Sequence, residues 1–177
     1  MKSADQKLFK EKLDYLKKVP LFKDLSSAQL GQLIAIMKAE HFETGSYVIR
    51  EGEAGSNLFI LLEGEVEISK ALVLPQWVKS QQKQEKSLLR LSEKHYPFFG
   101  EMAMFDDEPE RSASIVAIRP CLMAAITKKD LLKVLGSNPE IGMIIYRNIA
   151  SQLVQRLRKA NRDILKLTTA FTLALEG

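Results

Sequence analysis

The residues with the clearest capacity for chemistry lie within residues 98–114. Glu101 follows a glycine, and Arg111 comes later in the same segment with the hydroxyl of Ser112 beside it. A carboxylate accepts hydrogen bonds from hydroxyl groups, and a guanidinium group can bind two phosphate oxygens at once. Free amide groups at the start of a short helix also favour negative charge. Together these residue types indicate a site for a sugar phosphate.

The backbone around these side chains also follows a pattern. Gly100 stands between a bulky apolar pair and an acidic residue, which indicates that the chain approaches another group closely there. The apolar residues 102–105 are sufficient for one short helical turn. That turn is expected to end in the acidic residues 106–110, because Pro109 cannot continue a helix. The β-prone residues 114–118 then predict a strand.

Residues 98–114 resemble the phosphate-binding cassette of cyclic-nucleotide-binding domains. Their Gly-Glu and Arg-Ser pairs have the spacing of the bacterial cyclic-AMP receptor (catabolite activator) branch of that family. The resemblance implies that Glu101 holds the ribose 2′-hydroxyl and that Arg111 and Ser112 hold the cyclic phosphate. The binding residues expected from the cassette are Phe99, Gly100, Glu101, Met102, Arg111, Ser112 and Ala113.

The ligand implied by this resemblance is a cyclic nucleotide. Cyclic AMP is the expected one, while cyclic GMP and a cyclic dinucleotide remain open alternatives. Gly100 and Met102 are implied to contact the ligand through their backbones. A structural or interaction module with a degenerate pocket is a further alternative. The presence of both Glu101 and Arg111 argues against it, because a buried arginine is costly without an anion.

The composition is that of an ordinary globular chain of 177 residues, with 46% apolar and 27% charged residues. This length suits one domain with an appended helix. A formal net charge of +4 is too small to indicate nucleic-acid binding by itself. The single cysteine, Cys121, excludes an internal disulfide framework and fits a reducing compartment. Because no segment resembles a signal peptide or a membrane span, we expect a cytoplasmic protein that contacts no membrane.

Residue sets for other kinds of chemistry are missing from the sequence. The two histidines, His41 and His95, are far apart in the chain, so the usual histidine cluster of a metal-binding barrel is lacking. The sequence contains no apparent Ser–His–Asp or Cys–His constellation and no phosphate loop with Gly-Lys-Ser. Nothing supplies a nucleophile beside Glu101 and Arg111. We therefore expect a binding module without catalytic residues, and not an enzyme.

The elements that must position the cassette begin with two amphipathic helices. Residues 4–18 carry apolar side chains at helical spacing among lysines, and this helix is expected to end before Pro20. Residues 26–37 are expected to form the second helix. Ser26 and Gln29 have the spacing of a capping box at its start.

The next part of the chain has the pattern of short strands. Over residues 41–70 the apolar period is two, and glycine-containing turns separate β-branched and aromatic runs. Such a pattern is typical of an antiparallel barrel or jelly roll. Residues 73–87, which are rich in Gln and Lys and include Trp77, are expected to be an inserted loop. Residues 88–91 resume a strand, and residues 115–126 are expected to contain two strands separated by an Arg-Pro break.

The last part of the chain predicts a short helix and then a long one. Residues 128–135 are expected to form a helix that stops at Gly136, and residues 137–140 start the next. In the long helix, apolar residues recur at alternating steps of four and three, which indicates a coiled-coil seam. We expect residues 146–171 to join two copies of the chain in a parallel homodimer. The seam residues are Tyr146, Ala150, Leu153, Leu157, Ala160, Ile164, Leu167 and Phe171.

Other residues of this helix have separate expected roles. Ile141, Ile145 and Ile149 lie off the seam and can pack on the barrel. Arginines and lysines flank the seam; they could contact nucleic acid, but a solvated flank of a dimer helix is the interpretation that we favour. Asn161 is predicted to read the edge of the adenine, from its own subunit or from the partner, because its amide has both donors and acceptors. The alternative for Asn161 is a solvated surface residue.

The expected fold class is α+β: an antiparallel β-roll or jelly-roll barrel with N-terminal helices and a long C-terminal dimerisation helix. The expected divisions are N-terminal helices in residues 1–38, the β-roll in residues 39–127 and C-terminal helices in residues 128–177. The chain ends at Gly177 without the helix-turn-helix domain of the receptor branch, so we expect no direct DNA binding. The signal is expected to pass through the dimer or to an effector protein.

Overall fold

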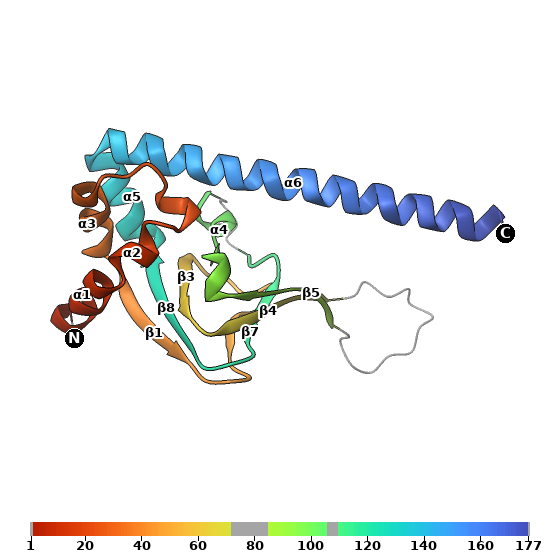
Figure 1. The fold of residues 1–177 in the computed structure, drawn as a ribbon, viewed down its shortest axis with the longest axis horizontal. Helices are drawn as coiled ribbons and strands as arrows, with labels where there is room; N and C mark the ends of the chain where they lie inside the picture. The colour runs from red at the N-terminus through yellow and green to blue at the C-terminus, as the bar shows by residue number, and fades with distance from the viewer. Residues whose placement is uncertain (1, 72–84, 106–109, 177) are drawn as a thin grey trace.

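The structure is a computed structural model that describes residues 2–71, 85–105 and 110–176. Within these residues, two four-stranded antiparallel sheets form the centre, in the orders β1-β8-β3-β6 and β2-β7-β4-β5. Helices lie on one side of the strands, and a long C-terminal helix runs across them (Figure 1). The expected α+β roll is confirmed. The strands are β1 Lys38–Phe42, β2 Tyr47–Ile49, β3 Asn57–Glu63, β4 Glu65–Ala71, β5 Glu85–Ser92, β6 Phe98–Phe99, β7 Ser114–Ala117 and β8 Cys121–Thr127.

The strand β3, in the middle of the first sheet, is apolar on both faces. Leu58, Ile60 and Leu62 join the hydrophobic cluster under the helices, whereas Phe59 and Leu61 join the cluster between the two sheets. Successive side chains of a strand point to opposite faces, so one continuous apolar run can contribute to two cores. The first sheet therefore lies between the helices and the second sheet.

The prediction of a single helix over residues 4–18 is wrong, because the N-terminal segment forms two helices. The helix breaks at Lys12, and the short second helix directs Tyr15 toward the strands. The Tyr15 hydroxyl lies within hydrogen-bond distance of two backbone oxygens, 2.6 Å from that of Leu61 and 2.8 Å from that of Glu93. Burial raises the pKa of Tyr15, so the phenol stays a donor. These tertiary contacts outweigh the local preference for one helix. The bounds are α1 Lys2–Glu11, α2 Leu13–Leu16 and η1 Pro20–Phe22.

The helix α3, Ser27–Ile34, begins as its sequence predicts. Ser26 accepts a hydrogen bond from the Gln29 backbone at 3.2 Å, and the Gln29 side chain accepts one from the Ser26 backbone at 2.9 Å. This reciprocal pair is the expected capping box. The helix ends at Ile34 and not at Met37, which is nevertheless buried in the turn that follows.

The two C-terminal helices are α5, Lys128–Ser137, and α6, Pro139–Glu176. Gly136 lies inside α5, so the stop expected there is wrong. The helix ends instead before Pro139, because the residue before a proline is disfavoured in the helical conformation. Ile141, Ile145 and Ile149 are buried in the cluster under the helices, as predicted. Beyond them α6 continues past the sheets, and its C-terminal end lies far from the N-terminal helices (Figure 1).

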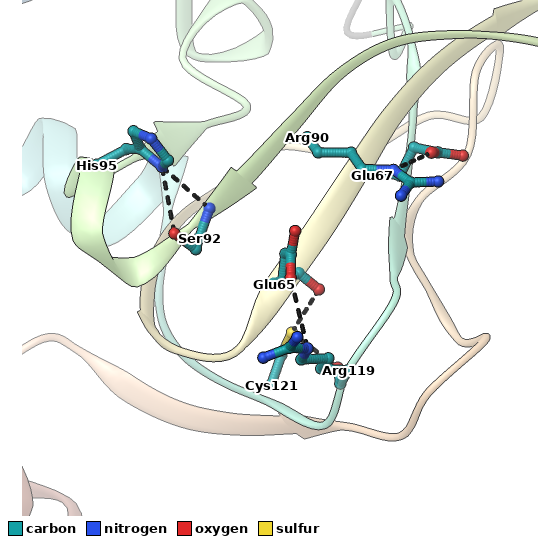
Figure 2. A network of polar contacts seen from close by, with 7 residues as sticks. All are labelled: Glu65, Glu67, Arg90, Ser92, His95, Arg119 and Cys121. Carbon is teal, nitrogen blue, oxygen red and sulfur yellow. Dashed lines mark hydrogen bonds and ion pairs between the residues drawn. The ribbon is translucent and has the colours of Figure 1, made fainter.

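The turn between β3 and β4 joins the two sheets. Gly64 has a φ of +99°, and a Cβ there would lie 2.4 Å from the carbonyl oxygen of Pro120. Figure 2 shows Glu65 pairing with Arg119, at 3.4 Å, and the Cys121 thiol directed at the Glu65 carbonyl oxygen at the same distance. Burial raises the pKa of Cys121, which is consistent with a packing role and not with a reactive thiolate.

Some sequence-based expectations concern residues at or outside the described ranges. The predicted insertion over residues 73–87 lies mostly outside them. β5 begins at Glu85, ahead of the strand expected at residues 88–91, because it pairs with β4 along most of that strand's length. In the part of the chain that the structure describes, no helix is long and apolar enough to cross a membrane.

Candidate functional site

The cassette residues line a hollow between the second sheet and α6. The chain enters it from β6, forms the short helix α4, Met102–Phe105, and returns through residues 110–113 to β7. Every predicted site residue except Asn161 lines this hollow. Asn161 is exposed on α6, beyond the hollow's lining residues. The full lining consists of Ile49, Ile68, Phe99, Gly100, Glu101, Met102, Ala103, Glu110, Arg111, Ser112, Ala113, Ile115 and Arg156.

Glu101 is a buried carboxylate with one satisfied oxygen. Only 2% of the residue is exposed. Its Oε1 accepts a hydrogen bond from Nη1 of Arg156, which reaches it from α6. Its Oε2 is buried and has no hydrogen-bond partner among the described residues. A buried acceptor without a donor is unfavourable, so this oxygen is suited to a hydroxyl or amide brought by a ligand.

Arg111 is buried in the same hollow, and only one of its two terminal nitrogens has a hydrogen-bond partner among the described residues. Its Nη2 donates to the carbonyl oxygen of Asn57 at 2.9 Å, while its Nη1 is buried without a partner among the described residues. Burial lowers the pKa of Arg111, and the negative charge of Glu101 partly opposes that shift. A buried guanidinium with an unpaired N–H has a strong requirement for an acceptor, and an anion meets it best.

Two glycines leave the space that the Arg111 side chain occupies. Gly100 has a φ of +86°, and a Cβ there would lie 2.5 Å from the Asn57 carbonyl oxygen and 2.7 Å from Nη1 of Arg111. A Cβ on Gly55 would lie 2.7 Å from Nε of Arg111. The sequence predicts a close approach at Gly100, whereas Gly55 falls among the glycine-containing turns expected over residues 41–70. Its contact with Arg111 depends on a fold that brings the loop before β3 over the cassette.

The backbone of Arg111 is held by the same loop. Its amide donates to the Glu53 carbonyl oxygen at 3.0 Å, and its carbonyl oxygen accepts from the Gly52 amide at 2.8 Å. An isolated bridge pairs Ala54 with Glu110. The side chain therefore projects from a backbone that is anchored on both sides, which orients the guanidinium group before any ligand arrives.

The rest of the hollow has a polar wall and an apolar wall. The Ser112 hydroxyl is exposed and donates to Sδ of Met102 at 3.5 Å. Ile49, Ile68 and Ile115 form the apolar wall. Such a wall suits the flat face of a base or another apolar group. Among the described residues, no three His, Cys, Asp or Glu side chains lie close enough together to hold a metal ion.

Arg156 is the charged residue of α6 that joins the site from outside the predicted set, because the sequence analysis assigns the cations of this helix to a solvated flank. Its Nη2 also donates to the Phe98 carbonyl oxygen at 3.2 Å, and its guanidinium lies 5.8 Å from the centre of the Phe98 ring. A signal for it was present: helical spacing from Ile145 and Ile149 places position 156 on the helix face that packs on the roll. A cation on that face can reach the roll while part of its side chain remains in solvent.

Comparison with known families adds a second kind of observation. The family model for the cyclic nucleotide-binding domain matches residues 39–138, more than half of the chain. The chain belongs to the cyclic nucleotide-binding domain family. The resemblance of the cassette to this family is thus confirmed by a match that also covers the strands around it. The family is that of a regulatory, typically non-catalytic domain.

Related proteins include both kinds of cyclic-nucleotide-dependent kinase. The chain is 34% identical to mouse cGMP-dependent protein kinase 2 over 120 residues, which are 66% of this chain and 14% of that protein. It is 31% identical over 137 residues to the cAMP-dependent protein kinase regulatory subunit of Eremothecium gossypii, covering 75% of this chain and 26% of that subunit. The chain therefore spans a minor part of these relatives.

Solved structures of bacterial members share the fold. A cyclic nucleotide-binding domain from Methylobacillus flagellatus is 27% identical with a TM-score of 0.73, covering 90% of this chain and 84% of that one. The Thermus thermophilus catabolite activator protein is 26% identical with a TM-score of 0.70, covering 84% of this chain and 63% of that one. The similarity to the catabolite activator branch, stated from the cassette, holds for this cyclic nucleotide-binding domain as a whole.

Proposed function

We propose that this cyclic nucleotide-binding domain is a non-enzymatic sensor that binds cyclic AMP in the cassette and passes the signal through α6. The observation that carries the proposal is a pair of buried atoms in one hollow, Oε2 of Glu101 and Nη1 of Arg111, for which the described part of the chain supplies no partner. One is an acceptor and the other a charged donor. A ligand that has both a hydroxyl and a phosphate would satisfy both atoms, and a ribose cyclic phosphate has these groups.

In this proposal each cassette residue has a defined contact. The ribose 2′-hydroxyl donates to Oε2 of Glu101, the free oxygen, so that Arg156 keeps its place on Oε1. A phosphate oxygen accepts from Nη1 of Arg111, and the Ser112 hydroxyl turns from the Met102 sulfur to a second phosphate oxygen. A phosphate oxygen is a much stronger acceptor than a thioether, so this exchange is favourable.

The Glu101–Arg156 ion pair supports the coupling between ligand and helix. A ligand hydroxyl on Glu101 and the Arg156 guanidinium share one carboxylate, so each stabilises the orientation that the other requires. Because α6 supplies Arg156, ligand binding favours the helix position seen here over positions in which Arg156 has left the hollow. The ligand shifts that equilibrium only by its difference in affinity for the two arrangements.

The exposed face of α6 supports a homodimer as the unit that receives the signal. Along the predicted seam, Leu157, Ile164, Leu167 and Phe171 are exposed by 60% or more. A single isolated helix with such a stripe is typical of a surface that pairs with another helix. A second copy of α6 in parallel register is the occupant that the heptad spacing favours, and an effector protein that binds the same stripe is the alternative.

The choice of cyclic AMP over other cyclic nucleotides depends on which residue recognises the base. Asn161 remains our candidate for reading adenine, and because it lies outside the hollow of its own chain it would reach the base from the partner subunit or after a shift of α6. The relatives named above carry cyclic AMP or cyclic GMP in their names. Both nucleotides present the same ribose cyclic phosphate to Glu101 and Arg111.

Calorimetric titration with cyclic AMP, cyclic GMP, a cyclic dinucleotide and linear 5′-AMP tests the proposal directly. We expect saturable binding of cyclic AMP that is tighter than binding of the other three. Tighter binding of cyclic GMP would keep the sensor and change its ligand. If none of the four binds, the pocket is degenerate, and the exposed stripe of α6 makes an interaction module the better description.

A further inference from the structure

A methionine with an exposed side chain lines the hollow of the candidate site. Met102 is 53% exposed and lines the same hollow as Glu101 and Arg111. Methionines elsewhere in the described body of the protein, at 37, 104 and 123, are at most 5% exposed. Met143 on α6 is 74% exposed but does not line the hollow. Of these side chains, Met102 alone combines accessibility with a place in the site.

The sulfur of Met102 is also in contact with a residue of the anion site. Its Sδ lies 3.5 Å from the Ser112 hydroxyl, which donates to it. Ser112 follows Arg111, whose Nη1 has no partner within the residues that the structure describes. A thioether is a weak acceptor, so Ser112 can leave it readily for a phosphate oxygen. The strength of the acceptor on residue 102 therefore determines how available the Ser112 hydroxyl is.

We propose that Met102 is an oxidation site that makes nucleotide affinity sensitive to peroxides. The sulfur lone pair attacks one oxygen of hydrogen peroxide, the O–O bond breaks, and proton transfer releases water. The thioether loses two electrons and becomes a sulfoxide, while the peroxide is reduced. The reaction is reversible by methionine sulfoxide reductases, so the modification can serve as a switch. The consequence for affinity rests on the proposed function.

The sulfoxide changes the site in two ways that both oppose an anion. Its oxygen is a stronger acceptor than the original sulfur, so it retains the Ser112 hydroxyl that the phosphate would otherwise take. The oxygen also carries partial negative charge and adds volume beside Arg111 and Ser112. A phosphate would then lose one hydrogen bond and meet an additional negative dipole. Bound nucleotide, in turn, covers Met102 and slows its oxidation.

The test uses the full chain, with hydrogen peroxide as oxidant and cyclic AMP as the probe. Peptide mass mapping gives the fraction of sulfoxide at each methionine, and calorimetry gives the affinity before and after oxidation. We expect oxidised wild-type protein to lose affinity by at least about tenfold, the effect of one lost charge-assisted hydrogen bond. We expect Met143→Leu to behave like wild type. Treatment with the two stereospecific reductases should restore the affinity.

Met102→Leu is compared with its own untreated affinity, and peroxide should change that value by less than about twofold. Circular dichroism before and after treatment confirms that the fold is retained. The proposal is overturned if wild-type protein with sulfoxide at Met102 binds as tightly as before, or if Met102→Leu loses affinity equally. It is also overturned if peroxide that oxidises Met143 leaves unliganded Met102 intact. Absence of binding in untreated wild type overturns the proposed function, and this proposal with it.

Discussion

Arg156 of α6 and Glu101 of the cassette form an ion pair that joins the long helix to the candidate site. The side chain of Glu101 is 2% exposed and that of Arg156 is 50% exposed, so the pair lies at the edge of the solvent. If α6 moved away, this buried carboxylate would lose its ion-pair partner. The position of α6 and the charge environment of the pocket therefore both depend on this ion pair.

Arg156→Ala should separate ligand binding from the position of α6. We expect the variant to bind cyclic AMP but to lose most of the ligand-induced hydrogen-exchange protection over residues 150–165, because the shared carboxylate no longer reaches the helix. Arg158→Ala, an exposed cation of the same helix without a contact to Glu101, is the matched control and should keep the protection. Equal protection in both variants would show that α6 responds through some other contact.

Arg111→Ala should abolish nucleotide binding with the fold intact. The side chain supplies the buried Nη1, which has no partner in the described ranges, and a charge-assisted pair with phosphate contributes about 1.5–3 kcal/mol. We therefore expect affinity to fall by at least about tenfold in calorimetry. Arg90→Ala removes an exposed arginine that pairs with Glu67 at 2.8 Å (Figure 2), and its affinity should be unchanged. An Arg111→Ala variant that binds normally would refute the cassette assignment.

Gly100→Ala should disturb the site more than an equivalent change elsewhere. Gly100 and Gly45 have nearly the same positive φ, +86° and +85°, but a Cβ meets Asn57 and Arg111 at Gly100 and nothing within 4 Å at Gly45. Gly45→Ala should therefore cost only the left-handed strain, about 1–2 kcal/mol. Gly100→Ala should lower the free energy of unfolding further and displace Arg111. Chemical denaturation compares the two, and similar losses would mean that the contact at Gly100 is relieved at little cost.

Leu157→Lys should convert a dimer into monomers. The residue is 61% exposed in the single chain and lies at the centre of the predicted seam, where two lysines would face each other across the two-fold axis. Leu173→Lys is the control, because Leu173 is 65% exposed but lies on the other side of the helix. Analytical ultracentrifugation should give a dimer mass for the control alone. A monomeric wild-type protein would remove the coiled-coil interpretation.

Asn161→Ala should reduce affinity for cyclic AMP more than for cyclic GMP if the amide reads the adenine edge. If Asn161 reaches the base from the partner subunit, the effect should also require the dimer, because Asn161 lies outside the hollow of its own chain. In the Leu157→Lys background the substitution should then have no further effect, whereas an effect that persists there would indicate a shift of α6 in the same chain. Affinities for both nucleotides that match wild type would assign Asn161 to the solvated surface.

The spacing of chemical groups along the chain was sufficient to predict much of this protein. The predicted cassette residues from Phe99 to Ala113 are close together in the sequence, and the close approach expected at Gly100 is found in the structure. The two-residue period predicted the roll, because a strand must alternate its faces. The burial of Ile145 and Ile149 was predictable for the corresponding reason in a helix.

Contacts between distant segments were decided only by the tertiary structure. The break at Lys12 depends on hydrogen bonds from Tyr15 to β3 and to residue 93, and no local pattern encodes them. The space left by Gly55 for Arg111 and the ion pair of Arg156 with Glu101 likewise join residues far apart in the chain. A residue's type states which partners it can have, but its distance to them depends on how the whole chain packs. The sequence shows that Arg156 is a cation, but only the packing of α6 on the roll makes it part of the site.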